Sequence, residues 1–306
     1  MLWEETFGAQ LEKFLRKEQF IFHAPMSEHT TFKIGGEADV LIFPSSAEEV
    51  SKIFRLIELF SLPCTILGNG SNVLVRDKGI RGAVVKFTEK FFGDMRCEGQ
   101  RLTACAGARL KDVSYFAAEN GLTGMEFAVG IPGSIGGAIF MNAGAYDGEM
   151  KNTVASVKAV TYGGEFVEFS GASLQLGYRH SIFQENGCAI CEVELILQRG
   201  AFDEIREKMA DFTVRRESRQ PLDMPSAGST FKRPKGHFAG TLIDKTGLKG
   251  LRVGGAMVSE KHAGFVVNIG GATAQDVLNL IEEVKRRVNE AHGVTLTPEV
   301  RIIGEE

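Results

Sequence analysis

The strongest constraint in this sequence is a glycine-rich stretch between Met125 and Met150. Its sequence, MEFAVGIPGSIGGAIFMNAGAYDGEM, is largely apolar but is broken repeatedly by glycine and alanine. Glycine weakens the interior of a helix or a strand, so one regular element cannot span the whole stretch. Small residues of this kind serve either close packing in a core or a backbone that wraps round a flat or phosphorylated ligand.

A second glycine motif, LGNGSNVLVRD, extends from Leu67 to Asp77 and follows the apolar segment CTIL. Backbone N–H groups in such a turn can converge on an anion, and glycine lets the backbone approach a pyrophosphate closely. A strand, NVLV, follows where a Rossmann fingerprint has a helix, and the P-loop pattern GxxxxGK[ST] is absent. A lone GNG is more often a tight turn, but two glycine loops in one predicted domain favour a nucleotide cofactor.

Hydrophobic periodicity predicts a chain of mixed helices and strands. Helices are expected in the first twenty residues and then over 50–57, 110–117, 205–212 and 277–288. Short strands are expected between them, notably over 38–44, within 154–198 and in the closing segment VTLTPEVRIIG. The prolines of RRESRQPLDMP indicate a loop after the fourth helix.

A chain of 306 residues is long enough for two or three domains. A change in composition near residue 200 indicates the main boundary. We therefore expect an α+β fold with an N-terminal lead-in over 1–30, a ligand-binding region over 31–198 that divides near residue 96, and a further domain over 199–306.

Composition argues against several classes of partner. The net charge of −4 gives no strong positive field for nucleic acid or anionic lipid. No apolar run reaches membrane-spanning length, and the amphipathic N-terminal segment is unlike a signal peptide. Five scattered cysteines indicate a reducing cytosol. Cys188 and Cys191 form a CxxC in a predicted strand, where residues three apart point to opposite faces, so we expect no metal site.

Six motifs occur in the order seen in one enzyme family. They are HTTFKIGGEAD, LGNGSNVLVRD, IPGSIGGA with NAGAY, YRHSIF, AGSTFKRP and LTPEVRIIG. Over about residues 29–303 the chain thus resembles the shorter subtype of the UDP-N-acetylenolpyruvoylglucosamine reductases, the MurB family. The resemblance implies a two-part FAD-binding region of the vanillyl-alcohol-oxidase (PCMH) type and an α+β substrate-binding domain.

The same resemblance implies the reaction and its partners. Such an enzyme carries non-covalent FAD and uses NADPH to reduce UDP-N-acetylglucosamine enolpyruvate to UDP-N-acetylmuramate, in peptidoglycan precursor synthesis. It implies a cytoplasmic protein, which we expect to be a monomer.

The resemblance also assigns residues by matched position. The catalytic residues would be Arg179 of YRHSIF, Ser229 of AGSTFKRP and Glu299 of TPEVR. Those contacting FAD would be Gly68, Asn69, Gly70, Ser71, Asn72, Gly133, Ser134, Gly137 and Ala138. Those contacting the substrate would be Tyr178, Lys232, Arg233, Lys249 and His262.

The chain departs from some family members at three points. Arg233 stands where some have Asn, and His262 where some have Gln. The tyrosine-bearing loop of the longer members is absent, so another group must take its place over the uridine.

These residue types suit the chemistry that the resemblance implies. Hydride addition to the enolpyruvyl group builds negative charge on the neighbouring carbon and its carboxylate, which a permanently ionised arginine can stabilise. Ser229 can deliver the final proton if a neighbour such as Lys232 polarises it. Glu299 can assist if it is protonated or orients another group.

Taken singly, each of these residues has an ordinary structural interpretation. Ser229 can cap a turn, Arg179 can be a surface arginine, and Glu299 can begin an edge strand. Two other functions also stay open: an FAD-dependent alcohol oxidase of the same fold, and a nucleotide-sugar binding protein without turnover. Tight, reducible flavin would exclude the binding protein.

Overall fold

The computed structural model describes residues 3–306, which form two compact units. The first unit takes the described residues up to Phe22, with Val40–Asn69 and Gly82–Arg215. The second takes His23–Asp39, Gly70–Arg81 and Arg216–Glu306. Both units are therefore assembled from separate stretches of chain, and one crossing from the first to the second falls inside the GNGSN motif, after Asn69.

The N-terminal third of the chain forms a four-stranded sheet with the order β1-β2-β5-β3. Its strands are β1 (Phe20–Pro25), β2 (Glu37–Ile42), β3 (Cys64–Leu67) and β5 (Ile80–Lys86), and its helices are α1 (Trp3–Leu11) and α2 (Ala47–Leu59). β3 and β5 are parallel, with Leu67 opposite Lys86. Ser46 caps α2 by accepting the N–H of Glu49.

The first helix is shorter than the sequence predicts. α1 ends at Leu11, whereas the prediction extended through the first twenty residues. Successive residues of β1 alternate between more and less exposed positions, as expected of a strand at the surface of the sheet. Leu15 is still buried in the core, which satisfies its hydrophobic pattern without a helix.

A five-stranded antiparallel sheet forms the centre of the first unit, in the order β12-β11-β13-β7-β6. Its strands are β6 (Met95–Glu98), β7 (Arg101–Cys105), β11 (Val154–Val160), β12 (Phe166–Ser170) and β13 (Ala189–Ile196). The predicted strands of this region are confirmed. Cys191 lies in β13, where burial raises the pKa of its thiol to about 12 and keeps it protonated.

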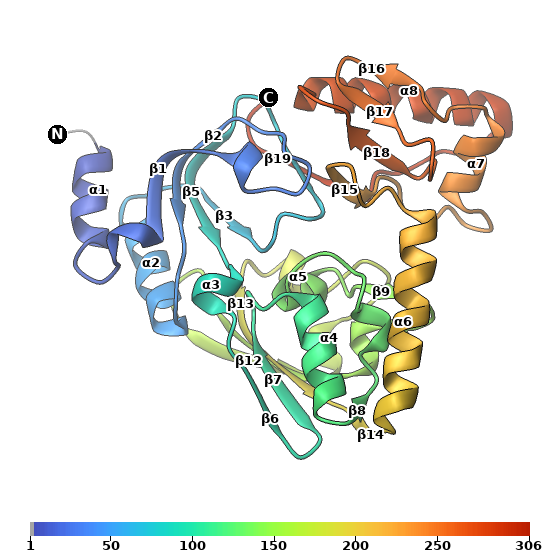
Figure 1. The fold of residues 1–306 in the computed structure, drawn as a ribbon. Coiled ribbons are helices and arrows are strands. Elements are labelled where there is room, and N and C mark those ends of the chain that lie inside the picture. The colour runs from blue at the N-terminus through green and yellow to red at the C-terminus, as the bar shows by residue number, and fades with distance from the viewer. Residues whose placement is uncertain (1–2) are drawn as a thin grey trace. The chain divides into compact units, whose positions relative to one another are not determined.

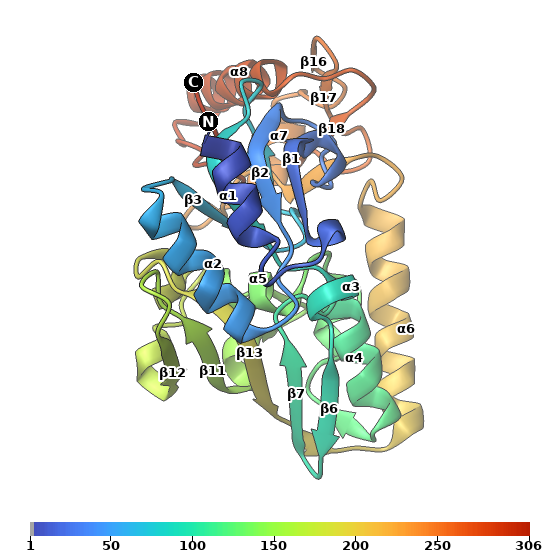
Figure 2. The same ribbon diagram turned by 90° about the vertical axis from the view of Figure 1, so that its left-hand side faces the viewer.

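Short helices and hairpins complete the first unit. They are α3 (Glu89–Phe92), α4 (Leu110–Glu119), β8 (Leu122–Thr123), α5 (Ile135–Phe140), β9 (Gly144–Ala145), β10 (Gly148–Glu149) and β14 (Gln198–Arg199). α6 (Phe202–Arg219) runs beside α4 (Figures 1 and 2), and its Ile205 and Met209 pack on Ala118. α6 extends through RRESR to Arg219, and the loop that the prolines predict begins at Gln220.

The second unit is built on a four-stranded antiparallel sheet, in the order β15-β18-β17-β16. These strands are β15 (Ser226–Ser229), β16 (Arg252–Val253), β17 (Ala256–Val258) and β18 (Phe265–Asn268), and the helices are α7 (Ala239–Lys245) and α8 (Ala274–His292). The predicted apolar face of α8 is buried, through Val277, Leu280, Ile281, Val284 and Val288. Figure 1 shows α8 along this sheet, beside β16 and β17.

The closing segment of the chain pairs with the GNGSN region. β19 (Arg301–Ile303) is parallel to β4 (Val73–Val75), with Arg301 opposite Val73. The predicted final strand is therefore present but short. Its partner lies far back in the sequence, which periodicity alone cannot indicate.

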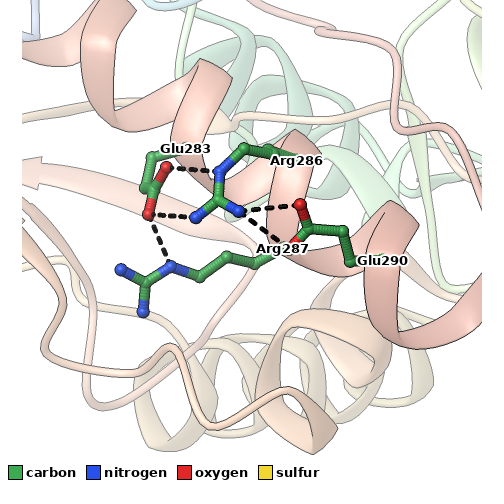
Figure 3. Close-up of polar contacts among 4 residues, drawn as sticks. All are labelled: Glu283, Arg286, Arg287 and Glu290. Carbon is green, nitrogen blue, oxygen red and sulfur yellow. Dashed lines mark hydrogen bonds and ion pairs between the residues drawn. The ribbon is translucent and has the colours of Figure 1, made fainter.

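The outer face of α8 carries a chain of ion pairs (Figure 3). Glu283 accepts hydrogen bonds from Arg286 and Arg287, and Arg286 also pairs with Glu290 at 2.8 Å. The bonds from the two arginines lower the pKa of Glu283 to about 2. Such exposed pairs three and four residues apart support a helix modestly, so burial of the opposite face fixes α8.

Within residues 3–306, no helix combines the length and apolar character that crossing a membrane requires. The expected divisions at residues 30, 96 and 199 remain predictions about domain boundaries. Residues 23–39 and 70–81 belong to the same compact unit as the C-terminal part of the chain.

Candidate functional site

The two glycine motifs meet in the first unit. A Cβ placed on Gly68 would lie 2.6 Å from the Oγ of Ser134 and 3.9 Å from the backbone nitrogen of Gly137. Ser134 is buried and caps α5, because its Oγ accepts the N–H of Gly137. Gly133 just before it has a φ of +129°, which a side chain would strain. We call Gly68, Ser134 and Gly137 the glycine cradle.

Other glycines of the second motif serve packing. A Cβ on Gly136 would lie 2.9 Å from the Cβ of Ala106, and one on Gly148 would lie 2.6 Å from the ring of Phe127. These contacts support the interpretation that small residues in this stretch serve close packing. Near Ser134 a neighbouring loop approaches closely, and further along the chain the contacts lie within the core.

Gly70 is required for a different reason from Gly68. It belongs to the second unit, has a φ of +70°, and a Cβ there would lie 2.7 Å from the carbonyl oxygen of His29. The N–H of Thr31 donates to the carbonyl of Gly70 at 3.2 Å. The need for glycine at position 70 thus follows from the neighbouring chain, whereas the sequence suggested a phosphate.

A buried lysine lies beside the glycine cradle. Lys86 is 7% exposed, and its Nζ donates to the carbonyl oxygen of Gly68 at 3.2 Å. Burial lowers the pKa of this ammonium group to about 8. Lys86 was not among the residues predicted from the sequence, because it ends an apolar strand outside both glycine motifs.

Arg179 lies in a tight turn of the first unit. Gly177 and His180 exchange backbone hydrogen bonds of 3.1 and 3.2 Å, so Tyr178 and Arg179 form the tip. Arg179 has a φ of +54°, an uncommon conformation for a residue with a side chain. Its guanidinium carbon lies 5.7 Å from the ring centre of Tyr178, which is 61% exposed. Strained residues of this kind gather at functional sites.

Three polar residues hold this turn in place. The side chain of Asn142, in NAGAY, donates to the carbonyl of Gly177 at 2.9 Å. Ser181 and Gln184 both donate to the carbonyl of Phe140, at the end of α5. The sequence marked none of these three as functional, although NAGAY and YRHSIF were both recognised as motifs.

Ser229 and Glu299 come from neighbouring segments of the second unit. Ser229 stands opposite Phe265 of β18, after a bulge at which Gly228 has a φ of +74°. A bulge of this kind redirects the side chains that follow it. The buried Thr230 comes next, and its carbonyl accepts the N–H of Glu299 at 2.7 Å.

Asn72 connects the GNGSN motif to the same place. Its side chain donates to the carbonyl oxygen of Glu299 at 3.3 Å, and its own carbonyl accepts the N–H of Arg301 at 3.0 Å. Glu299 is buried, with 9% exposure. The backbone at Glu299 is therefore fixed from two sides, by Thr230 and by Asn72.

The predicted substrate residues of the second unit lie on nearby loops. Lys232 and Arg233 are exposed, and the Arg233 guanidinium lies 4.6 Å from the ring centre of Phe238. Lys249 pairs with Asp244 at 3.0 Å. The Nδ1 of His262 accepts the N–H of Gly264 at 3.0 Å, so its neutral ring carries the proton on Nε2. Burial lowers the pKa of His262 and keeps that ring neutral.

The predicted residues thus divide between the units. The glycine cradle, Tyr178 and Arg179 lie in the first, and Ser229 and Glu299 lie in the second with the lysines, Arg233 and His262. Across residues 3–306, no group of three or more His, Cys, Asp and Glu side chains is arranged to hold a metal ion. The cradle brings the two glycine motifs together beside the ammonium group of Lys86.

Two family models match separate parts of the chain. Residues 38–170 match a family model described as an FAD binding domain, and residues 220–303 match one described as the UDP-N-acetylenolpyruvoylglucosamine reductase C-terminal domain. The predicted fold class is confirmed. A solved alkyldihydroxyacetonephosphate synthase, 15% identical with a TM-score of 0.50 over 63% of this chain and 40% of its own, shares the fold.

More similar relatives extend over nearly the whole chain. A curated UDP-N-acetylenolpyruvoylglucosamine reductase of Clostridium perfringens is 50% identical over 300 residues, which are 98% of each protein. One of Clostridium botulinum is 48% identical over 99% of this chain and 98% of its own. The crystal structure of the reductase MurB from Thermus caldophilus has a TM-score of 0.79 and 37% identity, covering 92% of this chain and 97% of its own. The chain therefore belongs to the UDP-N-acetylenolpyruvoylglucosamine reductase family and is an FAD-dependent oxidoreductase.

Proposed function

We propose that the chain reduces UDP-N-acetylglucosamine enolpyruvate to UDP-N-acetylmuramate with NADPH, as a step of peptidoglycan precursor synthesis. Full-length identity of about half to curated reductases supports this assignment. FAD, when bound, would supply the chemistry of hydride transfer between NADPH and the vinyl carbon of the enolpyruvyl group. The protein's own residues must bind the two partners, stabilise the charge that develops and supply one proton.

The observation that carries the proposal is the neighbourhood of Ser229 and Glu299. Ser229 follows a bulge, and the next residue, Thr230, accepts the backbone N–H of Glu299 at 2.7 Å. Two groups with the chemistry of proton donors thus belong to adjacent, hydrogen-bonded segments. We assign Ser229 as the donor of the proton to carbon, with Glu299 assisting in protonated form or by orienting another group.

Arg179 would stabilise the developing negative charge. A guanidinium stays ionised, and a residue at the tip of a braced turn is held in one orientation at little further entropy cost. The three bonds from Asn142, Ser181 and Gln184 support this role, because a charge stabiliser must be positioned before the reaction.

The predicted cofactor residues are consistent with a non-covalent FAD site. In the first unit, Gly68 lies close to Ser134, whose Oγ accepts the N–H of Gly137, so the two glycine motifs meet there. We assign the diphosphate to this cradle. Further predicted contacts come from Asn69, Gly70, Ser71, Asn72, Gly133 and Ala138.

The substrate would be held mainly by cations of the second unit. Lys232 and Arg233 are adjacent and exposed, which suits the diphosphate of the UDP-sugar. Lys249, His262 and Tyr178 are assigned as further contacts. His262, with its proton on Nε2, would act as a neutral donor, as the glutamine found in some relatives can.

Two rival functions receive less support. An FAD-dependent alcohol oxidase would have no use for the serine segment, whereas residues 220–303 match the C-terminal domain of the reductases. A binding protein without turnover would not need a braced arginine beside a flavin site.

We also propose that the chain acts as a cytoplasmic monomer, without nucleic acid or membrane, and that its domains divide near residues 30, 96 and 199.

Anaerobic absorbance spectra of the purified protein test the proposed function. The protein should carry about one FAD, which denaturation releases. NADPH should bleach the flavin, and UDP-N-acetylglucosamine enolpyruvate should restore its absorbance. A flavin that molecular oxygen reoxidises rapidly, and that ignores the enolpyruvyl substrate, would favour the oxidase. A colourless protein would favour the binding protein.

A further inference from the structure

We propose that Lys86 is a charged residue of the cofactor site, where its ammonium group attracts the diphosphate of FAD. The inference rests on the proposed function and extends it to a residue outside both glycine motifs. Neither the GNGSN segment nor IPGSIGGA contains a lysine or an arginine. A diphosphate held by those two segments alone would be met by backbone dipoles and neutral polar side chains, with no full positive charge.

The position of Lys86 follows from strand register. β3 and β5 run parallel, and Lys86, the last residue of β5, lies opposite Leu67, the last residue of β3. Gly68 comes next, and its carbonyl accepts a hydrogen bond from the Lys86 Nζ at 3.2 Å. Both strands therefore end at the same edge, and ligands of parallel sheets bind at the carboxyl ends of strands. The ammonium is thus next to the glycine cradle.

Burial makes a purely structural role unfavourable for a lysine. Only 7% of Lys86 is exposed, and burial lowers the pKa of its ammonium to about 8. At neutral pH the side chain is still mostly charged, which costs free energy away from water. A neutral glutamine would donate to the Gly68 carbonyl without that cost. An anion that binds beside the ammonium would favour its charged form.

The elements next to Lys86 differ in the charges that they carry. α5 carries none. The ionisable residue of β3 is Cys64, whose thiol pKa burial raises to about 12, so it is neutral at physiological pH. Glu89, at the start of α3, is already paired with Arg109 at 2.9 Å. β2, the other strand beside β5, carries Glu37 and Asp39, and Asp39 is paired with Arg81. An anionic ligand beside Lys86 would add to the interactions that its side chain already makes.

The binding test compares apoprotein variants by titration with FAD, ADP and riboflavin. Lys86→Gln keeps a donor for Gly68 but removes the charge. This variant should bind FAD and ADP about 10- to 100-fold more weakly, which corresponds to the loss of one charge-assisted hydrogen bond. Riboflavin, which has no phosphate, should bind as to the wild type. Lys86→Arg should restore most of the affinity, and Lys90→Gln, at an exposed lysine four residues on, is the matched control.

The pH dependence gives a second readout. The free ammonium loses its proton as the pH rises through about 8. A bound diphosphate raises that pKa, so binding above pH 8 must take up a proton and becomes weaker. The dissociation constant for FAD should rise between pH 7 and pH 9.5 in the wild type, and this rise should be absent in Lys86→Gln.

The outcomes separate the two proposals. Normal FAD and ADP affinity in Lys86→Gln would overturn the role of Lys86 and leave the reductase assignment standing. Equal losses of affinity for FAD, ADP and riboflavin, with thermal unfolding of the apoprotein at a lower temperature, would show that Lys86 is structural. That result would also overturn its proposed role. A wild-type protein that binds neither FAD nor ADP would overturn both. Selective loss of the two diphosphates, with rescue by arginine, is the supporting result.

Discussion

The glycine cradle and the Ser229–Glu299 region are built on opposite principles. The cradle consists of small residues and backbone N–H groups, and what matters there is the absence of side chains. The Ser229–Glu299 region depends on particular side chains, which buried backbone bonds through Thr230 and Asn72 hold in place. A site made of backbone can be recognised in the sequence by its glycines. A site made of side chains is recognisable only with knowledge of which distant segments meet.

Among the variants that test this difference, Ser229→Ala should have the largest effect. If Ser229 acts only on the substrate, NADPH should still reduce the flavin at the normal rate. Reoxidation by the enolpyruvyl substrate should slow by about 10³-fold or more, toward the upper end for loss of a general acid. Stopped-flow flavin absorbance separates the two half-reactions. Ser229→Cys should recover part of the rate, because a thiol is the stronger acid. Slow flavin reduction with normal reoxidation would contradict the assignment.

Valine at the two glycines of GNGSN should have different effects. Gly68→Val would fill the cradle beside Ser134, so FAD affinity should fall by about 100-fold with little loss of stability elsewhere. Gly70→Val meets the backbone of His29 at a φ of +70°, so the free energy of unfolding should fall by about 2–3 kcal/mol. FAD affinity should weaken there as a consequence.

Flavin fluorescence titrations and denaturant unfolding of the apoproteins measure the two effects. Gly68→Ala and Gly70→Ala test the Cβ contacts by themselves, because alanine adds that atom and nothing larger. Equal stability losses at positions 68 and 70 would show that the cradle is a packing feature.

The Asn72→Leu variant tests whether Asn72 acts with the glycine cradle or with the Ser229–Glu299 region. The family resemblance assigned Asn72 to FAD, yet its side chain donates to the carbonyl of Glu299. If it positions Glu299, the variant should lose about tenfold in substrate-dependent reoxidation, the worth of one hydrogen bond to the backbone. FAD affinity should stay within twofold of wild type. A large rise in the FAD dissociation constant with normal reoxidation would instead support the assignment of Asn72 to the FAD site.

The smallest expected effect concerns Asp77, at the end of the same motif. Its carboxylate accepts the N–H groups of Ala274 and Gln275, so it caps α8 from a distant part of the chain. Asp77→Ala should lower the free energy of unfolding by about 1 kcal/mol and leave both half-reactions unchanged. Denaturant unfolding measures the loss, and Asp77→Asn should retain much of the cap. A catalytic defect would mean that α8 influences the reacting groups.

The sequence predicted what depends on local pattern. The buried face of α8 repeats every three to four residues, and the glycine loops stand out by composition, so both could be foreseen. Lys86 could not, because a lysine that ends an apolar strand looks like a surface residue until register brings it to Gly68. The bracing of Arg179 by Asn142 also requires tertiary contacts, since its polar bonds cross from one motif to another.

The pairing of β4 with β19 has a consequence for synthesis on the ribosome. Asn72 and Glu299 are 227 residues apart in the chain. At roughly 5–20 residues per second, the first must wait on the order of 10–50 s for the second to be made. During that time β4 has no parallel partner, and its open edge can pair with other chains. The nascent protein is thus most prone to aggregate late in translation, and slow codons in the last third of its gene would prolong that exposure.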